Sequence, residues 1–475
     1  MGQEIDRTAF TGKDFARFAA KLGEETSLLS AFIREGRCST VGPIIGVELE
    51  AWLVDEQMQP APLNTEYLEI LADPLASPEL AKFNVEFNSY PTHLDGSALS
   101  RLESELAQTL NRAYQAASKL GLHLITIGIL PTLRDTHLIP ANMSTLKRYH
   151  ALNEQILRTT GKPIQVDISG HQHIRRAHPD VMLEAATTSF QIHLQDSAAR
   201  IHRLYNAAML ASAPLVAVSQ NSPFLFGRDL WGETRIALFE QAVPVGGFRA
   251  ASSGPLHRVG FGSGYARRSI GECFEENLQH YPALLPICYD TEPGAFAHLR
   301  LHNGTIWRWN RPLVGFDPDG TPHLRIEHRV MPSGPTVVDS VANAAFYFGL
   351  TESFCEHGIE SFIPFAQARD DFYLAARHGL DAHVVWIDGE KLRLRALLQK
   401  RLLPMAREGL ESLHVDTPDI DRFLGAIQER VNTGQTGTEW QRQQMRAQPG
   451  DFARMTATYL ENQVGGRPVH EWRSL

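Results

Sequence analysis

The sequence predicts an α+β protein built on a largely antiparallel sheet, with helices packed on one face and a polar, site-forming face opposite. Candidate strands are spread along the chain with helices between them. These strands alternate apolar and polar residues, whereas parallel strands that are buried on both faces are apolar throughout. The 475 residues, of which 43% are hydrophobic, suffice for one large domain or two to three ordinary ones.

The first candidate strand, residues 46–54, shows the alternation most clearly. Its odd-numbered residues from Val47 to Leu53 are apolar, while Glu48 and Glu50 lie on the other face. Two carboxylates about 7 Å apart on one face repel each other unless water or a cation lies between them. For this strand alone, a solvated acidic face explains the pattern equally well. Alternating segments return at residues 82–89, 189–194 and 324–330.

Apolar stripes at helical spacing and glycine stops predict the helices. We expect a single domain over residues 1–475, in which residues 351–475 form a helical C-terminal extension. Further strands are expected at residues 122–130 and 296–309. The helices are expected at residues 14–34, 98–120, 141–160, 197–218, 233–241, 337–350, 372–378, 392–408 and 417–431.

Composition excludes several classes of protein. The net charge of −9 and the absence of a basic block argue against nucleic acid as a partner. The most apolar runs, residues 122–131 and 207–218, are too short to cross a bilayer, so no membrane association is expected. Four scattered cysteines lack zinc spacing, and residues 1–14 lack a hydrophobic signal core. We therefore expect a cytoplasmic protein with reduced thiols.

The polar faces of the strands carry residue types that bind divalent cations. Carboxylates with one imidazole favour Mg²⁺ or Mn²⁺ over zinc, provided that the strands converge in space. Nearby arginines could neutralise a transferring phosphoryl group. The candidate ligands are Glu48, Glu50, Glu86, Gln191, His193 and Glu327, and the arginines are Arg235, Arg308, Arg311 and Arg329.

Five motifs occur in order between about residues 44 and 345. They are residues 46–50, the strand around Glu86, residues 182–194, residues 221–224 with Gly227 and Arg235, and residues 325–329. With these motifs the chain resembles the glutamate–cysteine ligase family of the plant and actinobacterial kind, which is part of the glutamine-synthetase-like carboxylate–amine ligases. The resemblance implies a curved antiparallel sheet whose concave face holds ATP and catalytic Mg²⁺ or Mn²⁺.

By the resemblance, each motif residue has an implied role. Arg235 and Arg329 would contact substrate or phosphate, and Asn221 and Gln191 would lie on the nucleotide side. The implied reaction is ATP-dependent joining of glutamate to cysteine through an acyl phosphate, a step of glutathione biosynthesis. No cysteine-pocket residues can be matched, so the amine is open. The implied metal ligands are Glu48, Glu50, Glu86, His193 and Glu327.

Alternative interpretations stay open. The same fold could serve a ligase for another amine, a kinase, or a non-catalytic nucleotide- or metabolite-binding relative. His171 and His173 have zinc-like spacing, but no third ligand is spaced to join them. Residues 260–264 are glycine-rich without the strand and helix that a dinucleotide loop requires. Trp307 and Trp309 could be half-buried strand aromatics or a platform for adenine or substrate.

Overall fold

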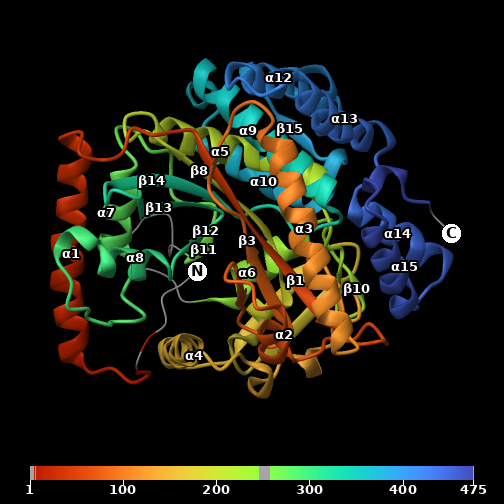
Figure 1. Cartoon of the computed structure of the whole chain (residues 1–475), viewed down its shortest axis with the longest axis horizontal. Helices are drawn as coiled ribbons and strands as arrows, with labels where there is room; N and C mark the ends of the chain where they lie inside the picture. Colours follow the sequence, from red (N-terminus) through yellow and green to blue (C-terminus); the bar gives the residue numbers. More distant parts are fainter. Residues whose placement is uncertain (1–4, 6, 245–256, 474–475) are drawn as a thin grey trace.

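An antiparallel sheet of eight strands lies at the centre of the molecule (Figure 1). The computed structural model describes residue 5 and residues 7–244 and 257–473, so part of the polar N-terminal segment lies outside the described residues. The main strand order is β13-β14-β8-β1-β3-β2, and β4 and β5 also pair with β1. The strands are β1 (Ile44–Val54), β2 (Ala76–Pro78), β3 (Asn84–Asn88), β4 (Thr92–His93), β5 (His123–Ile125), β8 (Phe190–Asp196), β13 (Asn310–Phe316) and β14 (Pro322–His328).

The alternation predicted for four strands is confirmed, since β1, β3, β8 and β14 pair with their neighbours side by side. Both faces of β1 are covered, however. Val47 and Leu49 are each 2% exposed, while Glu48 and Glu50 on the opposite face are only 8% and 9% exposed. The solvated acidic face is therefore wrong, and these carboxylates lie in a buried polar layer.

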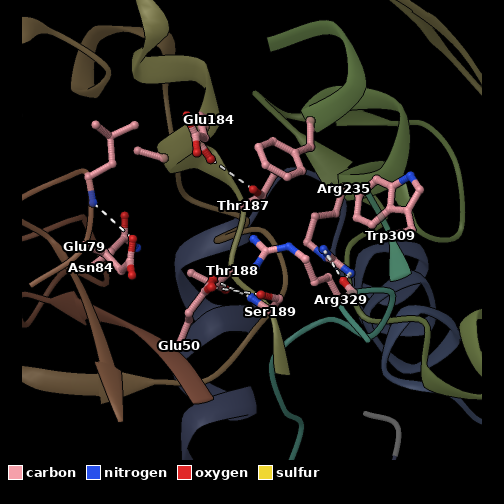
Figure 2. A pocket seen from close by; sticks show the side chains of 13 residues that line it. Glu50, Glu79, Asn84, Glu184, Thr187, Thr188, Ser189, Arg235, Trp309 and Arg329 are labelled. Carbon is pink, nitrogen blue, oxygen red and sulfur yellow. Dashed lines mark hydrogen bonds between the residues drawn. The ribbon is translucent and has the colours of Figure 1, made fainter. Parts of the chain in front are cut away.

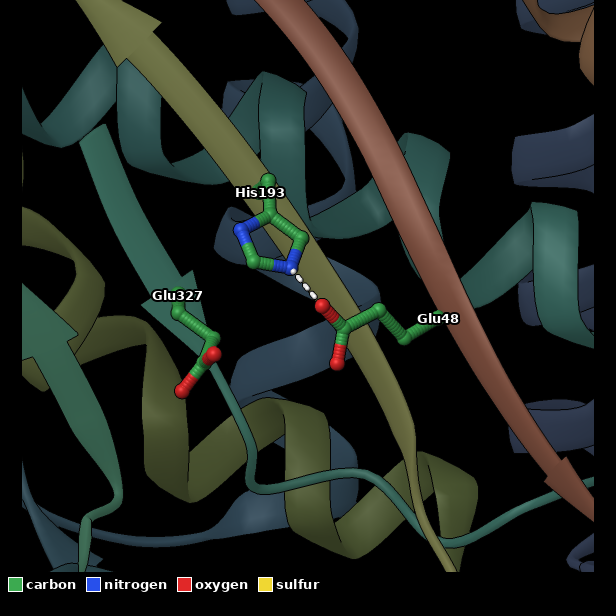
Figure 3. A group of neighbouring side chains, drawn as sticks. All are labelled: Glu48, His193 and Glu327. Atoms are coloured by element: carbon green, nitrogen blue, oxygen red, sulfur yellow. Dashed lines mark hydrogen bonds and ion pairs between the residues drawn. The ribbon is translucent and has the colours of Figure 1, made fainter. Parts of the chain in front are cut away.

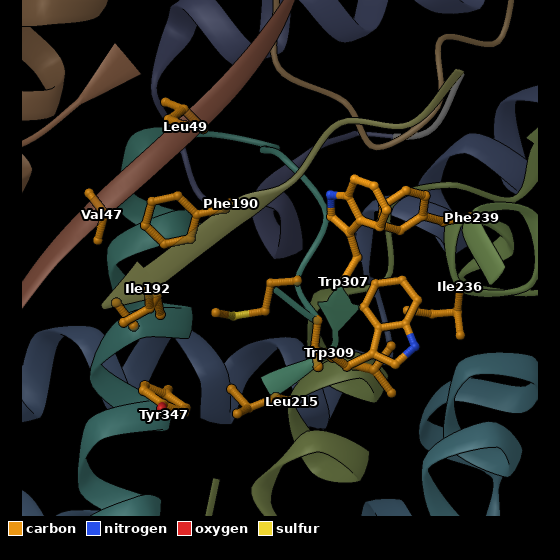
Figure 4. Close-up of a cluster of buried hydrophobic side chains, with 14 of the residues drawn as sticks. Val47, Leu49, Phe190, Ile192, Leu215, Ile236, Phe239, Trp307, Trp309 and Tyr347 are labelled. Atoms are coloured by element: carbon orange, nitrogen blue, oxygen red, sulfur yellow. The ribbon is translucent and has the colours of Figure 1, made fainter. Parts of the chain in front are cut away.

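Two long helices, α5 (Ile201–Ser219) and α9 (Val337–His357), contact each other behind the sheet and are buried over most of their length. Apolar side chains of β1 and β8 pack with residues of both helices in one cluster (Figure 4). This packing orients Glu48 and Glu50, which alternate with the apolar residues of β1, toward the opposite face of the sheet. The cluster includes Val47, Leu49, Phe190, Ile192, Leu215 and Tyr347.

The other helices surround this core (Figure 1). Helix α1 packs against α7 and α8 at one edge, and α12 and α13 pack on α9. The helices are α1 (Gly12–Arg34), α2 (Asn64–Leu71), α3 (Ala98–Lys119), α4 (Lys147–Thr160), α6 (Thr234–Ala242), α7 (Gly271–His280), α8 (Ala297–Asn303), α10 (Phe365–His378), α11 (Leu394–Leu397), α12 (Leu403–Ser412), α13 (Thr417–Thr433), α14 (Gly437–Ala447) and α15 (Phe452–Gly465). A π-helical turn (Leu398–Leu402) joins α11 to α12.

The remaining strands of the described residues form four short two-stranded sheets. They are β6 (Ile164–Ser169) with β7 (His173–His178), β9 (Phe224–Leu225) with β10 (Arg228–Asp229), β11 (Val259–Gly260) with β12 (Trp307–Arg308), and β15 (His383–Val385) with β16 (Lys391–Arg393). Among the described residues, no helix is both long and apolar enough to cross a membrane.

Three local predictions are wrong. The strand expected at residues 122–130 exists only as β5, which ends at Ile125. Beyond it, Gly128 packs so closely on Pro332 that a Cβ at this position would lie 2.8 Å from the proline ring. Residues 297–303 form α8 instead of a strand, with His298 and His302 four residues apart and buried against α1. Helix α4 begins at Lys147, after a 3₁₀ turn (Pro140–Asn142), and not at residue 141.

The C-terminal third of the chain is helical, but its last helices were not predicted. Helices α14 and α15 follow α13 and pack against each other. In α14 most of the buried residues are small or polar, and Trp440 is its buried aromatic residue, so few apolar residues mark it as a helix in the sequence. The division into a single domain with residues 351–475 as an extension stays a prediction.

Candidate functional site

Strand pairing brings the predicted polar residues to one face of the sheet. His193 on β8 lies opposite Gly46 of β1 on one side and Glu327 of β14 on the other. Glu86 of β3 lies opposite Glu50 of β1. Because directly paired residues share a face, four strands place their polar side chains in one layer.

The first carboxylate cluster consists of Glu48, His193 and Glu327 (Figure 3). One ligand atom from each lies within 4.8 Å of the others, and His193 Nε2 is 3.0 Å from Glu48 Oε1. Arg325 holds the ring from the other side, because its Nε donates to His193 Nδ1 at 3.2 Å. Two carboxylates with one imidazole form a donor set suited to Mg²⁺ or Mn²⁺.

The second carboxylate cluster consists of Glu50, Glu79 and Glu86, again with ligand atoms within 4.8 Å. Ser189 donates both its backbone N–H and its hydroxyl to Glu50, at 2.7 and 2.8 Å. Glu79 was missed in the sequence, because it follows β2 and lies outside every alternating strand. The hairpin between β2 and β3 returns it to the sheet beside Glu86.

Arginines connect the two carboxylate clusters. Arg311 donates to both oxygens of Glu327, at 2.8 and 2.9 Å. Arg329 donates to Glu327 at 3.0 Å and also to Gln191, whose amide in turn donates to Glu50 at 2.7 Å. Arg329 therefore contacts Glu327 of the first cluster directly and is linked through Gln191 to Glu50 of the second cluster.

The carboxyl groups of the two clusters differ in pKa because their burial and their neighbouring charges differ. Burial raises the pKa of Glu50 to about 7, and the charge of Glu79 acts in the same direction. Burial and Glu48 raise the pKa of Glu86 well above its usual value. Burial also opposes ionisation of Glu327, but Arg311 and Arg329 outweigh it and lower the pKa to about 2. Within the part of the chain that the structure describes, no arginine donates a hydrogen bond to Glu50, Glu79 or Glu86, which is an arrangement that a divalent cation would neutralise.

A pocket opens beside the second cluster (Figure 2). Glu50 and Arg329 form part of its wall, and Trp309 and Phe239 form an apolar part. Arg235 also lines the pocket, with its guanidinium carbon 5.5 Å from the ring centre of Trp309. Its guanidinium donates to the backbone carbonyls of Arg329 and Val330. Arg235 thus holds the segment that carries Arg329 and borders the pocket.

Two predicted site residues are not brought to this face. Arg308 is 3% exposed and donates to Glu276 and Asn277 of α7, because β12 points it away from the pocket that its neighbour Trp309 lines. Asn221 is fully buried, and its amide donates to the Ser333 carbonyl and the Tyr459 hydroxyl. The expected roles of Arg308 with phosphate and of Asn221 with the nucleotide are therefore corrected. Asn221 fastens α15 to the core instead.

The two histidines with zinc-like spacing take separate acidic partners. His173 pairs with Asp167 at 2.8 Å and His171 with Asp229 at 3.1 Å, both on the exposed β6–β7 side. Neither belongs to a metal-competent cluster among the described residues. Trp307 packs edge-to-face on Phe239, with ring centres 6.5 Å apart.

Comparisons with known proteins agree on the class of fold. A family model described as glutamate–cysteine ligase family 2 (GCS2) matches residues 44–458. The glutamate–cysteine ligase of Francisella tularensis, solved with AMP, has a TM-score of 0.52 and 11% identity over 92% of this chain and 91% of that chain. A bifunctional glutathione synthetase of Pasteurella multocida has a TM-score of 0.48 and 10% identity over 93% of this chain and 55% of that chain. No curated protein matches significantly.

The predicted glutamine-synthetase-like fold is confirmed by the curved antiparallel sheet and by the Francisella structure. Family and fold together support a ligase that forms carbon–nitrogen bonds. The family model spans most of the chain, including both carboxylate clusters and the arginines between them. The chain therefore belongs to glutamate–cysteine ligase family 2.

Proposed function

We propose that this chain is an ATP-dependent carboxylate–amine ligase that joins the side-chain carboxylate of glutamate to the amine of cysteine. The observation that carries the proposal is the pair of carboxylate clusters on one sheet face, with Arg329 between them. Membership of the family supports both substrates, and the AMP in the Francisella structure supports a nucleotide site. The product would be γ-glutamylcysteine.

The donor chemistry of both clusters fits divalent cations. Glu48, His193 and Glu327 would hold one ion, while Glu50, Glu79 and Glu86 would hold another. Bound Mg²⁺ or Mn²⁺ would supply positive charge that stabilises the negative charge developing on the phosphates. The acids of the second cluster repel one another when all are ionised and no cation is bound. A cation would relieve this repulsion, and its binding would therefore be favoured.

The arginines would stabilise the remaining negative charge of the reaction. The γ-phosphoryl group would pass from ATP to an oxygen of the glutamate side-chain carboxylate, which releases ADP and forms an acyl phosphate. Arg329, held in place by Glu327, would stabilise the charge on the transferring group. Arg311 would keep Glu327 ionised and oriented. The amine would then attack the activated carbonyl and expel phosphate, so no protein nucleophile is required.

The test is phosphate release from ATP and Mg²⁺ with glutamate, with and without a panel of amines headed by cysteine. We expect release that depends on both glutamate and cysteine, and an amide product detected by mass spectrometry. Release stimulated by a different amine would keep the ligase and replace its second substrate. Phosphorylated product without an amine requirement would indicate a kinase. Silence across the panel with retained ATP binding would contradict the proposal and favour a binding role.

A further inference from the structure

Two side chains in the pocket carry buried polar atoms that have no hydrogen-bond partner among the described residues. Asn84 is only 2% exposed, yet neither atom of its amide is paired. The Oε2 atom of Glu184 is likewise buried and unpaired. Both residues line the pocket that contains Glu50 and Arg329 (Figure 2). Buried polar groups are nearly always hydrogen-bonded in folded proteins, so these two indicate a ligand.

Both side chains are held by rigid backbone. Asn84 begins β3, two residues before Glu86, so it projects from the same face of the sheet. Glu184 lies in a 3₁₀ turn (Val181–Ala186), which Asp180 caps by accepting the backbone N–H of Met182 at 2.9 Å. The Thr187 hydroxyl donates to the Glu184 carbonyl at 2.9 Å. The side chains are therefore positioned before a ligand arrives.

The charges of the pocket select the ligand. An ionised Glu184 can only accept hydrogen bonds, whereas the Asn84 amide both accepts and donates. Burial, together with Glu79 and Glu50, raises the pKa of Glu184 to about 8, so a cation beside it would restore its charge. Glu184 belongs to neither metal-competent cluster among the described residues. Arg329 contributes positive charge to the same wall.

We propose that Glu184 and Asn84 bind the α-ammonium group of the amino acid whose side-chain carboxylate is activated. This inference rests on the proposed function and deepens it, because it names the groups that distinguish an amino acid from a plain dicarboxylic acid. The Asn84 amide oxygen would accept a hydrogen bond from the ammonium group, and its NH₂ would donate to the α-carboxylate of the same amino acid. Glutamate would then lie with its α-carbon near Glu184 and its reacting carboxylate toward the two clusters.

The experiment compares L-glutamate with glutarate, which has the two carboxylates but no ammonium group. Calorimetric titrations in Mg²⁺ would use the wild type, Glu184→Gln and Asn84→Ala. Loss of a charge-assisted hydrogen bond should weaken glutamate binding about 10- to 100-fold in Glu184→Gln and leave glutarate binding within about 2-fold. Asn84→Ala should weaken glutamate more than glutarate. Asp371→Asn, a buried acid outside the pocket, is the matched control and should change neither.

The outcomes separate this inference from the proposed function. If Glu184→Gln stays folded by circular dichroism and its preference for glutamate over glutarate is unchanged, the inference is wrong even when the wild type is an active ligase. An equal loss for both ligands would overturn it too, because that indicates a structural role. If the wild type turns over a different amino acid, the glutamate assignment fails. The same titrations are then made with that amino acid and with its analogue that lacks the ammonium group. A wild type that binds no amino acid overturns both.

Discussion

Replacing Glu327 by glutamine tests the electrostatic design of the first cluster. The wild-type carboxylate accepts three hydrogen bonds from Arg311 and Arg329. Its pKa falls from 4.5 to about 2, and at about 1.4 kcal/mol per pKa unit this corresponds to about 3 kcal/mol of stabilisation. Glu327→Gln keeps the shape but removes the charge between two arginines whose side chains are only 11% and 13% exposed. We therefore expect the free energy of unfolding at pH 7 to fall by about 3 kcal/mol.

The pH dependence follows from the sign of the shift. A depressed pKa in the folded state stabilises the protein fully above the unfolded value of 4.5, and this stabilisation is lost as the pH falls toward about 2. The difference between wild type and Glu327→Gln should therefore shrink to less than half at pH 3. Urea unfolding with EDTA present, followed by tryptophan fluorescence, measures it without metal. Turnover with Mg²⁺ should drop about 10²- to 10³-fold.

A matched surface pair provides the control. Glu390 accepts from Arg401 at 2.7 Å, but both side chains are more than 40% exposed. Glu390→Gln should change the free energy of unfolding by less than about 1 kcal/mol, because water screens exposed ion pairs. The reasoning is refuted if Glu327→Gln and Glu390→Gln destabilise the protein equally.

Three further changes have distinct expected results. Glu86→Gln should relieve repulsion among the acids of the second cluster, so the metal-free protein should melt at a higher temperature. In scanning fluorimetry, the rise in melting temperature on adding excess Mg²⁺ should be largely lost. Asn221→Ala should cost about 2–4 kcal/mol in urea unfolding, because the Tyr459 hydroxyl and a backbone carbonyl lose a buried partner. Burial raises the pKa of Glu240 to about 7, so the wild type loses stability as the pH rises from 4.5 to 7, and Glu240→Gln should be more stable at pH 8 by up to about 3 kcal/mol.

Each of these expectations has a contrary result. A Glu86→Gln protein with the full Mg²⁺-induced rise would remove Glu86 from the metal ligands. Faster proteolysis of α14 and α15 should accompany Asn221→Ala, and equal cleavage rates would argue against a fastening role. The gain from Glu240→Gln should shrink to about a quarter at pH 5 and vanish well below pH 4.5, where the carboxyl is protonated in both the folded and the unfolded protein. A gain that is the same at pH 8 and at pH 5 would reject the pKa as its cause.

Much of the polar face of the sheet could be predicted from local pattern. The period of two placed Glu48 and Glu50 on one face of β1, and the same rule placed Glu327 and Arg329 together near the end of β14. Glu79 escaped this reasoning because it lies in the link between β2 and β3, where no periodicity applies. Arg308 was placed wrongly because β12 is a two-residue strand outside the main sheet, so its pairing does not follow that of β14.

The sequence by itself determined which strands alternate, which residue types each polar face carries, and the family to which the ordered motifs point. Tertiary structure decided which strands are neighbours, and with that the grouping of Glu48 with His193 and Glu327 and of Glu50 with Glu79 and Glu86. It also decided that the acidic face is buried and that unpaired groups of Asn84 and Glu184 meet in one pocket. The physical reason is the separation in sequence of the residues that interact. The direction of a side chain is set by local backbone geometry within its strand, whereas strand order and burial depend on elements that pack from distant parts of the chain.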